Sequence, residues 1–361
     1  MTVLWINLLV VFVFAALARM IPLARRDGLP DHAGSQEAVK PNKLLVAAAA
    51  ASIVLVSGLR NNIGDTPYYM NGYSLLEPTF EGFSFRGDFG FNALQIALKM
   101  LMPDPQALVF LTALATNVLI VAGLYRYALM IEVSLFLYIT TGMFTVSMNG
   151  IRQYLAAAIL FAGTHWLIRG DWKRYFPLVL LAATIHKTAL IMLPVYFFVR
   201  RKAWTKATML ILALAVMAVV GFELFFGALL VLLEGSKYAV YGNFDKGGAN
   251  IIRVAVAGVP LAIAFLGRRK LRNIWPESDV FVNMTLLGFV FMIISTANWI
   301  FARLNIYFGL YSLVLFSWII PLFAERYRKL AYYGVLVCHL LYFYYEHVVS
   351  LGLHYRSDYL L

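Results

Sequence analysis

Residues 5–23 read WINLLVVFVFAALARMIPL, an apolar stretch close to the roughly 20 residues that a helix needs to cross a bilayer. It has no positively charged leading region and no A-x-A-like cleavage site, so we expect a retained helix and not a signal peptide. Similar stretches recur along the chain, in which 62% of the 361 residues are hydrophobic and 13% are charged. The sequence therefore predicts an all-α polytopic membrane protein, organised as a single membrane domain over residues 1–361.

Basic residues gather between the apolar stretches and set the orientation by the positive-inside rule. With these clusters inside, the N-terminus lies outside, and the net charge of +12 belongs to cytoplasmic loops and not to a nucleic-acid site. Cys338 is the single cysteine, which excludes an intrachain disulfide and a cysteine metal cluster. We predict about ten transmembrane helices, at residues 3–24, 44–59, 107–124, 131–148, 153–168, 207–233, 251–267, 279–298, 304–324 and 330–350.

Two further apolar segments do not fit as simple spans. Residues 89–102 are too short to cross and have few basic neighbours, so we expect a helix on the outer face. Residues 175–199, YFPLVLLAATIHKTALIMLPVYFFV, are basic on both flanks. The segment is either a re-entrant hairpin that turns near His186 and Lys187, or a single span with one basic loop outside. With the hairpin, residues 60–106 form an outer-face loop region with short interfacial helices.

Three arginines lie at the ends of apolar stretches and outside the basic clusters: Arg60, Arg152 and Arg303. A guanidinium is always charged and its shape matches phosphate and carboxylate groups. A charge near the membrane interior is costly, so it indicates a functional site by default. In the hairpin topology all three lie at the outer face, and we expect them to bind an anionic ligand.

The segment RNNIGDTPYYMNGY, residues 60–73, is the densest polar stretch of the chain. The order Asp-Thr-Pro from Asp65 is typical of a helix start. Its tyrosines, Tyr69 among them, suit the membrane interface or stacking on sugar rings. Asp65, as the carboxylate of this segment, is also a candidate base. The alternatives are that the segment is an interfacial anchor or that Arg60 and Asp65 form only a local ion pair.

Asp88 lies just before the short apolar segment, in FEGFSFRGDFGFNAL. A carboxylate there can act as a general base on a sugar hydroxyl, or it can be a solvated loop charge. Gly150 interrupts the next helical pattern, so Arg152 and Gln153 open a new helix. An arginine in a first turn has the wrong sign for the helix dipole. This favours an anion-binding role for Arg152, with snorkelling to the interface as the alternative.

His186 and Lys187 lie between two apolar half-segments, which indicates a functional site by default. Arg303 and Tyr307 are four residues apart and share a helix face, an arrangement that suits a diphosphate and its sugar. The alternative for Tyr307 is an aromatic anchor at the interface. No histidine pair at i, i+4 and no HExxH motif occurs, so we expect neither a metal site nor another cofactor.

These motifs resemble those of the EpsG family. RNNIGDTPYY resembles its R-x-x-x-G-x-D-x-Y-type element, with the acidic residue moved by one position. SMNGIRQYLAAAI and LAATIHKTALIMLPVYF resemble its S-x-x-x-x-R-Q-x-x-A and I-H-x-[ST]-A segments. RLNIYF, residues 303–308, resembles its C-terminal element. The resemblance spans residues 45–325.

The EpsG family is similar to the Wzy-type polymerases, so the resemblance implies a GT-C-like fold and a metal-independent glycosyltransferase. It implies that repeat units on undecaprenyl diphosphate are joined into an exopolysaccharide at the outer face of the bacterial inner membrane. A flippase and a chain-length regulator are the implied partners. The residues assigned on this basis are Arg60, Arg152 and Arg303 for the diphosphate, His186, Asp65 and Asp88 as candidate bases, and Gln153, Tyr69, Lys187 and Tyr307 for other substrate contacts.

Two other functions fit some of the same residues. A transporter or flippase of a lipid-linked or anionic glycan would use the same arginines, but it should show an inverted repeat with paired broken helices. The sequence has one broken segment and no clear partner for it. An O-acyltransferase that uses His186 would need a path for an acyl donor from the cytoplasm.

Overall fold

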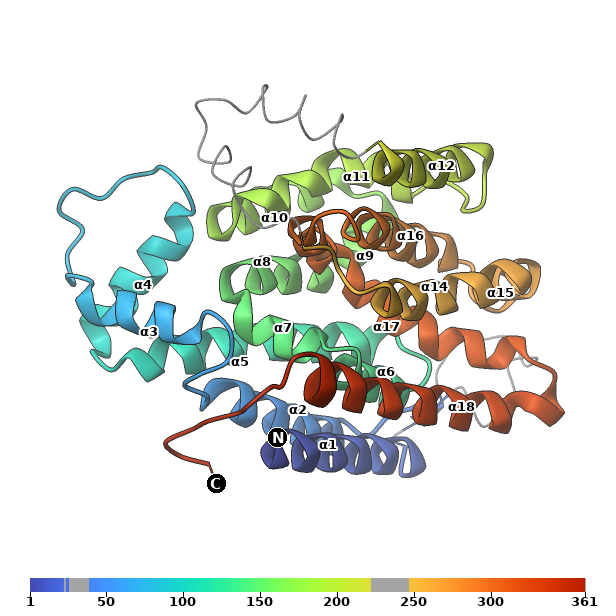
Figure 1. Ribbon diagram of the computed structural model, residues 1–361, viewed down its shortest axis with the longest axis horizontal. Coiled ribbons are helices and arrows are strands. Elements are labelled where there is room, and N and C mark those ends of the chain that lie inside the picture. The colour runs from blue at the N-terminus through green and yellow to red at the C-terminus, as the bar shows by residue number, and fades with distance from the viewer. Residues whose placement is uncertain (23, 26–38, 222–246, 361) are drawn as a thin grey trace.

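The computed structural model describes residues 1–22, 24–25, 39–221 and 247–360, and this part of the chain is almost wholly helical (Figure 1). One short antiparallel pair, β1 and β2, joins residues on either side of 26–38. The helices are α1 Thr2–Met20, α2 Lys43–Gly58, α3 Thr66–Leu75, α4 Phe89–Leu101, α5 Pro105–Tyr127, α6 Ile131–Thr140, α7 Met143–Asn149, α8 Ile151–Ala162, α9 Thr164–Arg169, α10 Trp172–Ile185, η1 Lys187–Ile191, α11 Met192–Val199, α12 Lys206–Val220, α14 Ile251–Leu266, α15 Arg268–Ile274, α16 Ser278–Ile294, η3 Trp299–Arg303, α17 Ile306–Ile319, η4 Ile320–Leu322 and α18 Glu325–Tyr344. A π-helical turn, η5 Tyr345–Ser350, extends α18, and the strands are β1 Ala24–Arg25 and β2 Val39–Lys40.

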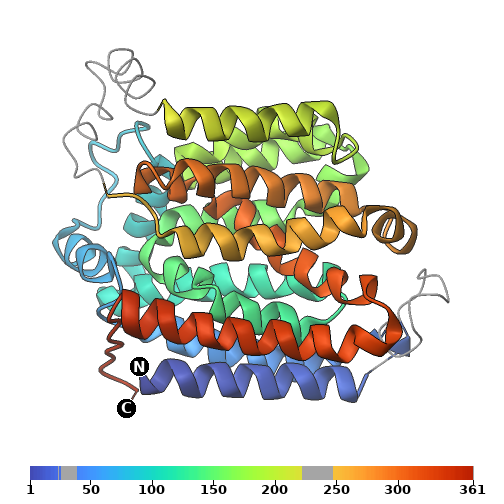
Figure 2. The ribbon, with the colours of Figure 1, turned by 45° about the vertical axis from the view of Figure 1, so that its right-hand side comes forward.

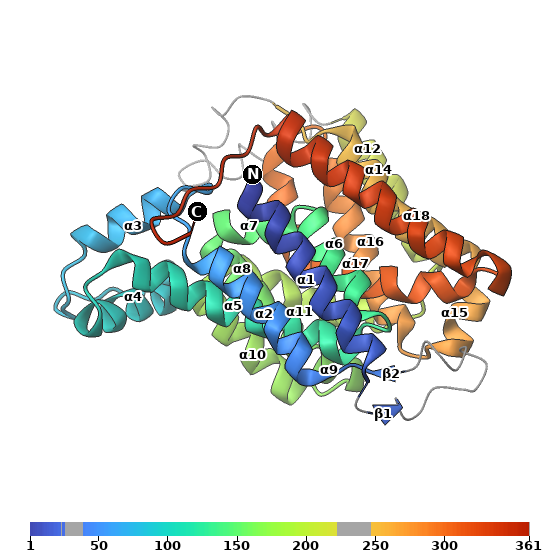
Figure 3. The ribbon, with the colours of Figure 1, turned by 90° about the horizontal axis from the view of Figure 1, so that it is seen from below.

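The long helices lie side by side in one bundle (Figure 2). At its centre, α17 packs against α6, α8 and α16, while α5 packs against α2 and α8. One continuous cluster of buried apolar side chains runs from α1 to α18. The termini and α3 lie at one end of the bundle, and the β pair and α15 lie at the other (Figure 3).

The basic segments converge at the end that holds α15. Arg272 Nη2 donates to the Ala203 carbonyl at 2.9 Å, and Lys270 Nζ donates to the Leu322 carbonyl at 3.1 Å. The segments that link the helices at this end are rich in Lys and Arg, as the positive-inside rule requires of a cytoplasmic face. By this rule we expect the end that holds α3 to be the outer one, and we call it the outer end.

Helix length does not confirm the prediction of about ten spans. In the described residues, two helices, α1 and α5, are long and apolar enough to cross a membrane. The count rises to four if each of two bent helix pairs, α6 with α7 and α14 with α15, forms one span. At both bends a glycine lies between the two helices: Gly142, with φ of 83°, separates α6 from α7, whose axes differ by 54°. Gly267 separates α14 from α15 at a bend of 82°. The predicted span 207–233 continues beyond α12 into residues outside the described part of the chain.

Residues 175–199 form a hairpin of α10, η1 and α11. The rings of Tyr175 and Tyr196, near its two ends, stack with centroids 5.6 Å apart. A Cβ on Gly170, just before α10, would lie 2.2 Å from the guanidinium of Arg200, just after α11. A single span would separate these ends by the thickness of the bilayer, so the geometry favours the re-entrant alternative. The chain turns at His186, whose extended backbone follows the last residue of α10.

Chemical labelling tests the hairpin. In a Cys338→Ser background, single cysteines at Lys173 and Lys202 should react with a membrane-impermeant maleimide in inside-out vesicles and not in spheroplasts, because both flanks lie at the basic face. A cysteine at the exposed loop residue Glu81 is the matched control and should show the opposite pattern. Labelling of position 202 from outside would establish a single span instead.

Candidate functional site

The tip of the hairpin meets the starts of two other helices at the outer end of the bundle. Helix α4 packs on α10 so closely that a Cβ on Gly90 would lie 2.2 Å from Thr184 Oγ1. Asp88 precedes α4 at the N-cap position, but its side chain makes no capping hydrogen bond. Its carboxylate turns instead toward the tip of the hairpin, where it meets His186.

The Asp88 carboxylate has three partners, each from a different backbone or side-chain group. Its Oδ2 accepts a hydrogen bond from Arg152 Nη1 at 2.9 Å and lies 3.1 Å from His186 Nδ1. Its Oδ1 accepts from the backbone N–H of Lys187 at 3.1 Å. The carboxylate therefore joins the hairpin tip to the start of α8. We call Asp88, Arg152 and His186 the Asp88 centre.

The charge of Asp88 follows from these contacts. Its side chain is only 10% exposed, and burial alone would raise the pKa of the carboxyl. The hydrogen bonds from His186 and the Lys187 amide, with the charge of Arg152, outweigh burial and lower this pKa below its ordinary value. Because an ionised carboxylate only accepts, His186 Nδ1 must donate to it, which leaves Nε2 of a neutral ring as an acceptor.

Arg152 keeps part of its guanidinium available. Nε donates to the hydroxyl of Tyr69 on α3 at 3.1 Å, and Nη1 is bound by Asp88. No hydrogen bond joins Nη2 to any described residue, and 36% of the side chain is exposed. The break predicted at Gly150 is confirmed, since α8 begins at Ile151. An arginine in this first turn opposes the helix dipole, and the Asp88 carboxylate compensates for it.

Two other predicted residues connect α17 to this region. Gln153 Nε2 donates to the backbone carbonyl of Arg303 at 2.7 Å. The hydroxyl of Tyr307 lies 2.8 Å from Thr188 Oγ1 on the hairpin, and the Tyr307 side chain is buried. Gln153 thus joins α8 to the end of η3, and Tyr307 joins α17 to the hairpin.

The side chains of Arg303 and Lys187 are exposed and lie outside the hydrogen bonds of the Asp88 centre. Arg303 places its guanidinium over the ring of Trp299, 5.4 Å from the centroid, and lines a neighbouring cavity. Lys187 contributes its backbone N–H to Asp88, while the residue itself is exposed. Arg152 and Arg303 therefore make separate contacts, the first with Asp88 and the second with the Trp299 ring, and their joint role as a clamp stays a prediction.

Arg60 departs from the expectation of an anion site. Its side chain is 1% exposed, and its donors go to Thr66 Oγ1 at 2.9 Å, to the Met148 carbonyl at 2.6 Å and to the Ser57 carbonyl. Burial lowers the pKa of Arg60 to about 9, so the group stays cationic at neutral pH. It joins the ends of α2 and α7 to the start of α3, and each of its three nitrogens already has a partner among the described residues.

The neighbouring asparagines also serve the fold. Asn62 Nδ2 donates to the His354 carbonyl at 2.6 Å, and the backbone N–H of Arg356 donates to Asn62 Oδ1 at 2.7 Å. The backbone N–H of Asn61 donates to the Arg356 carbonyl at 3.1 Å. The C-terminal strap, residues 354–360, is thereby held against the end of α2.

Asp65 lies apart from the Asp88 centre. It is the N-cap residue of α3, as predicted, but its side chain is exposed and makes no hydrogen bond to a described residue. Its backbone N–H donates to Asn149 Oδ1 at 2.9 Å. Of the two candidate carboxylates, only Asp88 contacts His186.

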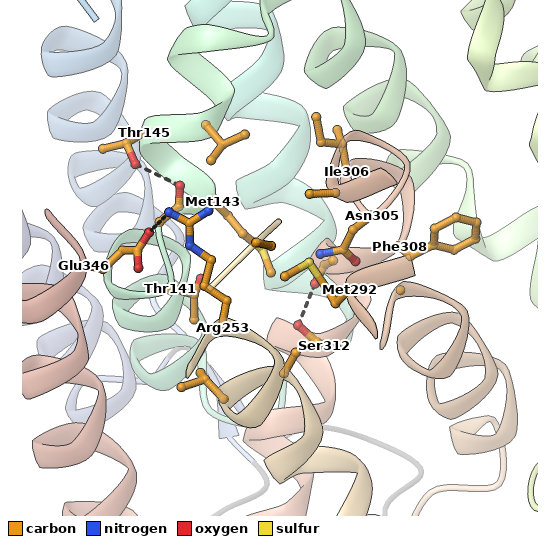
Figure 4. Close-up of a pocket in the computed structure, with 18 of the residues that line it drawn as sticks. Thr141, Met143, Thr145, Arg253, Met292, Asn305, Ile306, Phe308, Ser312 and Glu346 are labelled. Carbon is orange, nitrogen blue, oxygen red and sulfur yellow. Dashed lines mark hydrogen bonds and ion pairs between the residues drawn. The ribbon is translucent and has the colours of Figure 1, made fainter. Parts of the chain in front are cut away.

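Sequence reasoning missed two charged residues in the wall of the neighbouring cavity. Arg253, in the first turn of α14, forms an ion pair with the buried Glu346 of the π-helical turn (Figure 4). Both lie inside predicted spans, 251–267 and 330–350. A charge within an apolar span was therefore the signal that could have identified them.

Taken together, the apolar helices, the hairpin and the Asp88 centre indicate a helical membrane protein with an Arg–Asp–His site at the end of the bundle that holds α3. The chain belongs to the EpsG family, whose model matches residues 43–357. The matched region contains the Asp88 centre, the cavity and half of the C-terminal strap, and it excludes α1. No curated protein and no solved structure matches the chain. The GT-C-like architecture therefore stays a prediction.

Proposed function

We propose that the protein polymerises oligosaccharide repeat units carried on undecaprenyl diphosphate, at the outer face of the bacterial inner membrane. The EpsG family points to an exopolysaccharide-related polymerase, which is the broader class of this activity. The contact between Asp88 and His186, with Arg152 beside it, is the observation that carries the specific reaction. A flippase that delivers the lipid-linked repeat and a chain-length regulator are the partners that fit this reaction.

The proposed reaction needs a base for the acceptor hydroxyl. His186 Nε2 takes the proton while the hydroxyl oxygen attacks the anomeric carbon of the donor sugar. Asp88, which accepts from Nδ1–H, fixes the tautomer and stabilises the imidazolium that forms. The same carboxylate is a weak base itself, because its pKa is lowered. We therefore place His186 as the base and Asp88 as its orienting partner.

The proposed leaving group is the lipid diphosphate. The bond from the anomeric carbon to the phosphate oxygen breaks, and its electron pair leaves with the diphosphate. Arg152 Nη2 is a donor for the charge that develops there, and it is preorganised by Asp88 and Tyr69. All of these roles are filled by side chains of this chain.

Elongation of a defined lipid-linked repeat by the purified protein in detergent tests the proposal. Arg152→Lys should lower the rate by about 10- to 100-fold, because it keeps the charge but loses the planar fork. Arg86→Lys, in the exposed loop before α4, is the control and should leave the rate unchanged.

Two results would contradict the proposal. Wild-type protein that moves the lipid-linked repeat across vesicles without elongating it would be a transporter. Full elongation by the Arg152→Lys variant would remove Arg152 from the diphosphate site.

A further inference from the structure

A cavity of about 320 Å³ lies beside the Asp88 centre, between α7, α14, α16, α17 and the end of α18 (Figure 4). Its volume falls in the range of ligand pockets. Most of its wall is apolar, with Phe289, Met292 and Phe316 among the lining residues. Because it is lined by the first turns of α14 and α17 and the last turn of α18, it lies toward the outer end of the bundle.

The cavity has more positive than negative charge. Arg253 and Arg303 both line it, and Glu346 is the only carboxylate among its lining residues in the described chain. Glu346 pairs with Arg253 but not with Arg303. Arg253 Nε is buried and has no hydrogen-bond partner among the described residues, although a buried donor ordinarily has one. The Arg253 side chain as a whole is 31% exposed, so one exposed and one partly exposed guanidinium line the same cavity.

The cavity and the Asp88 centre share one segment of chain. Asn149 and Tyr154 line the cavity, whereas Arg152, between them, binds Asp88. Gln153 holds the same segment to Arg303 through the Arg303 carbonyl. Two regions with available arginine donors thus lie on the two sides of the start of α8.

We propose that this cavity binds the diphosphate and first isoprenoid units of a second lipid-linked substrate. The inference rests on the proposed function, because polymerisation joins two glycans and each is carried on a lipid diphosphate. Arg303 and the accessible part of the Arg253 guanidinium bind the phosphate oxygens, and the apolar wall contacts the isoprenoid chain. The Asp88 centre binds the other diphosphate through Arg152.

The geometry also explains the place of Glu346. An arginine in the first turn of α14 opposes the helix dipole, as Arg152 does in α8. Glu346 neutralises Arg253 in the same way that Asp88 neutralises Arg152. Each region therefore holds an arginine whose charge is balanced by a carboxylate, and Arg303 adds the unbalanced charge that a diphosphate requires.

Calorimetric titration of the full-length protein in detergent with farnesyl diphosphate tests the cavity directly, without any need for turnover. Arg303→Gln should weaken binding at one of two sites by about tenfold or more, the loss expected for a charge-assisted hydrogen bond. Ala257→Phe, which fills the cavity from α14, should abolish that site. Ala255→Phe, on the exposed face of the same helix, is the matched control, and this variant should still bind two molecules of farnesyl diphosphate.

A paired variant separates binding from folding. Arg253→Gln alone would leave Glu346 buried without its partner, so Arg253→Gln is combined with Glu346→Gln to remove both charges. Weaker binding by this pair at an unchanged melting temperature supports the proposal. If the pair does not fold, the Arg303→Gln and Ala257→Phe results decide.

Three outcomes would overturn the inference. Farnesyl diphosphate binding that is unchanged by Arg303→Gln and Ala257→Phe places the ligand elsewhere. Equal binding of inorganic diphosphate shows an anion site without lipid recognition, and equal competition by phosphatidylglycerol shows a headgroup site. Because these are binding measurements, a protein that binds in the cavity but does not elongate would refute the proposed function and not the site.

Discussion

Asp88→Asn is expected to lower the elongation rate by about 10³- to 10⁴-fold, the loss seen when the carboxylate that orients a catalytic histidine becomes an amide. An amide can donate as well as accept, so it no longer requires His186 to carry its proton on Nδ1. The substitution also removes the negative charge that stabilises the imidazolium. It also releases Arg152, which Asp88 binds at 2.9 Å. The measurement is single-turnover elongation of a lipid-linked repeat by the purified variant.

Asp65→Asn is the matched comparison, because Asp65 also precedes a short outer helix but is exposed and lies away from His186. We expect its rate to stay within about twofold of wild type, as for a surface substitution away from the chemistry. The double variant Asp88→Asn with His186→Gln should be no slower than the slower single variant, since the two side chains act as a unit. A normal rate for Asp88→Asn would show that His186 does not depend on Asp88 as its orienting partner, and a large loss for Asp65→Asn would make Asp65 the candidate base instead of His186.

Arg60→Met is expected to destabilise the protein by about 3 kcal/mol or more, because it leaves buried acceptors without a donor. The Met148 carbonyl at the end of α7 and the Ser57 carbonyl near the end of α2 both depend on this guanidinium. Arg60→Lys should have an intermediate effect, since one ammonium cannot reach all of these oxygens. The measurement is the melting temperature in detergent, with the exposed Arg86→Met as control.

The elongation rate per folded molecule distinguishes the two roles of Arg60. A residue that only holds α2, α3 and α7 together should change the amount of folded protein more than the rate of the molecules that remain folded. If Arg60→Met keeps its melting temperature and loses elongation, Arg60 binds the substrate after all.

Several local features could be predicted from the sequence alone. The start of α3 after Asp65 and the break at Gly150 are confirmed. The hairpin of residues 175–199 was one of two alternatives, and its ends do lie together. These features follow from chain stiffness, capping and the distribution of charge, which neighbouring residues specify.

The arginines show where local reasoning fails. Arg60, Arg152 and Arg303 share one sequence signature, a cation at the end of an apolar stretch. In the fold, Arg60 is buried, Arg152 donates one of its terminal nitrogens to Asp88, and Arg303 is exposed beside a cavity. Burial depends on which distant segment covers a side chain. The C-terminal strap packs near Arg60, and its residue His354 contacts Asn62 across 292 positions of sequence.

The sequence by itself determined the membrane class and the family, and it predicted a chain reversal near His186 as one of two alternatives, because hydrophobic length, charge asymmetry and motif spacing are properties of the linear chain. Only the tertiary structure decided which carboxylate partners His186. Asp65 and Asp88 are alike locally, since each is an N-cap residue whose side chain does not cap its helix. Asp88 is distinguished by contacts to Arg152 and His186, 64 and 98 positions away. Such contacts form only when α4, α8 and the hairpin pack together.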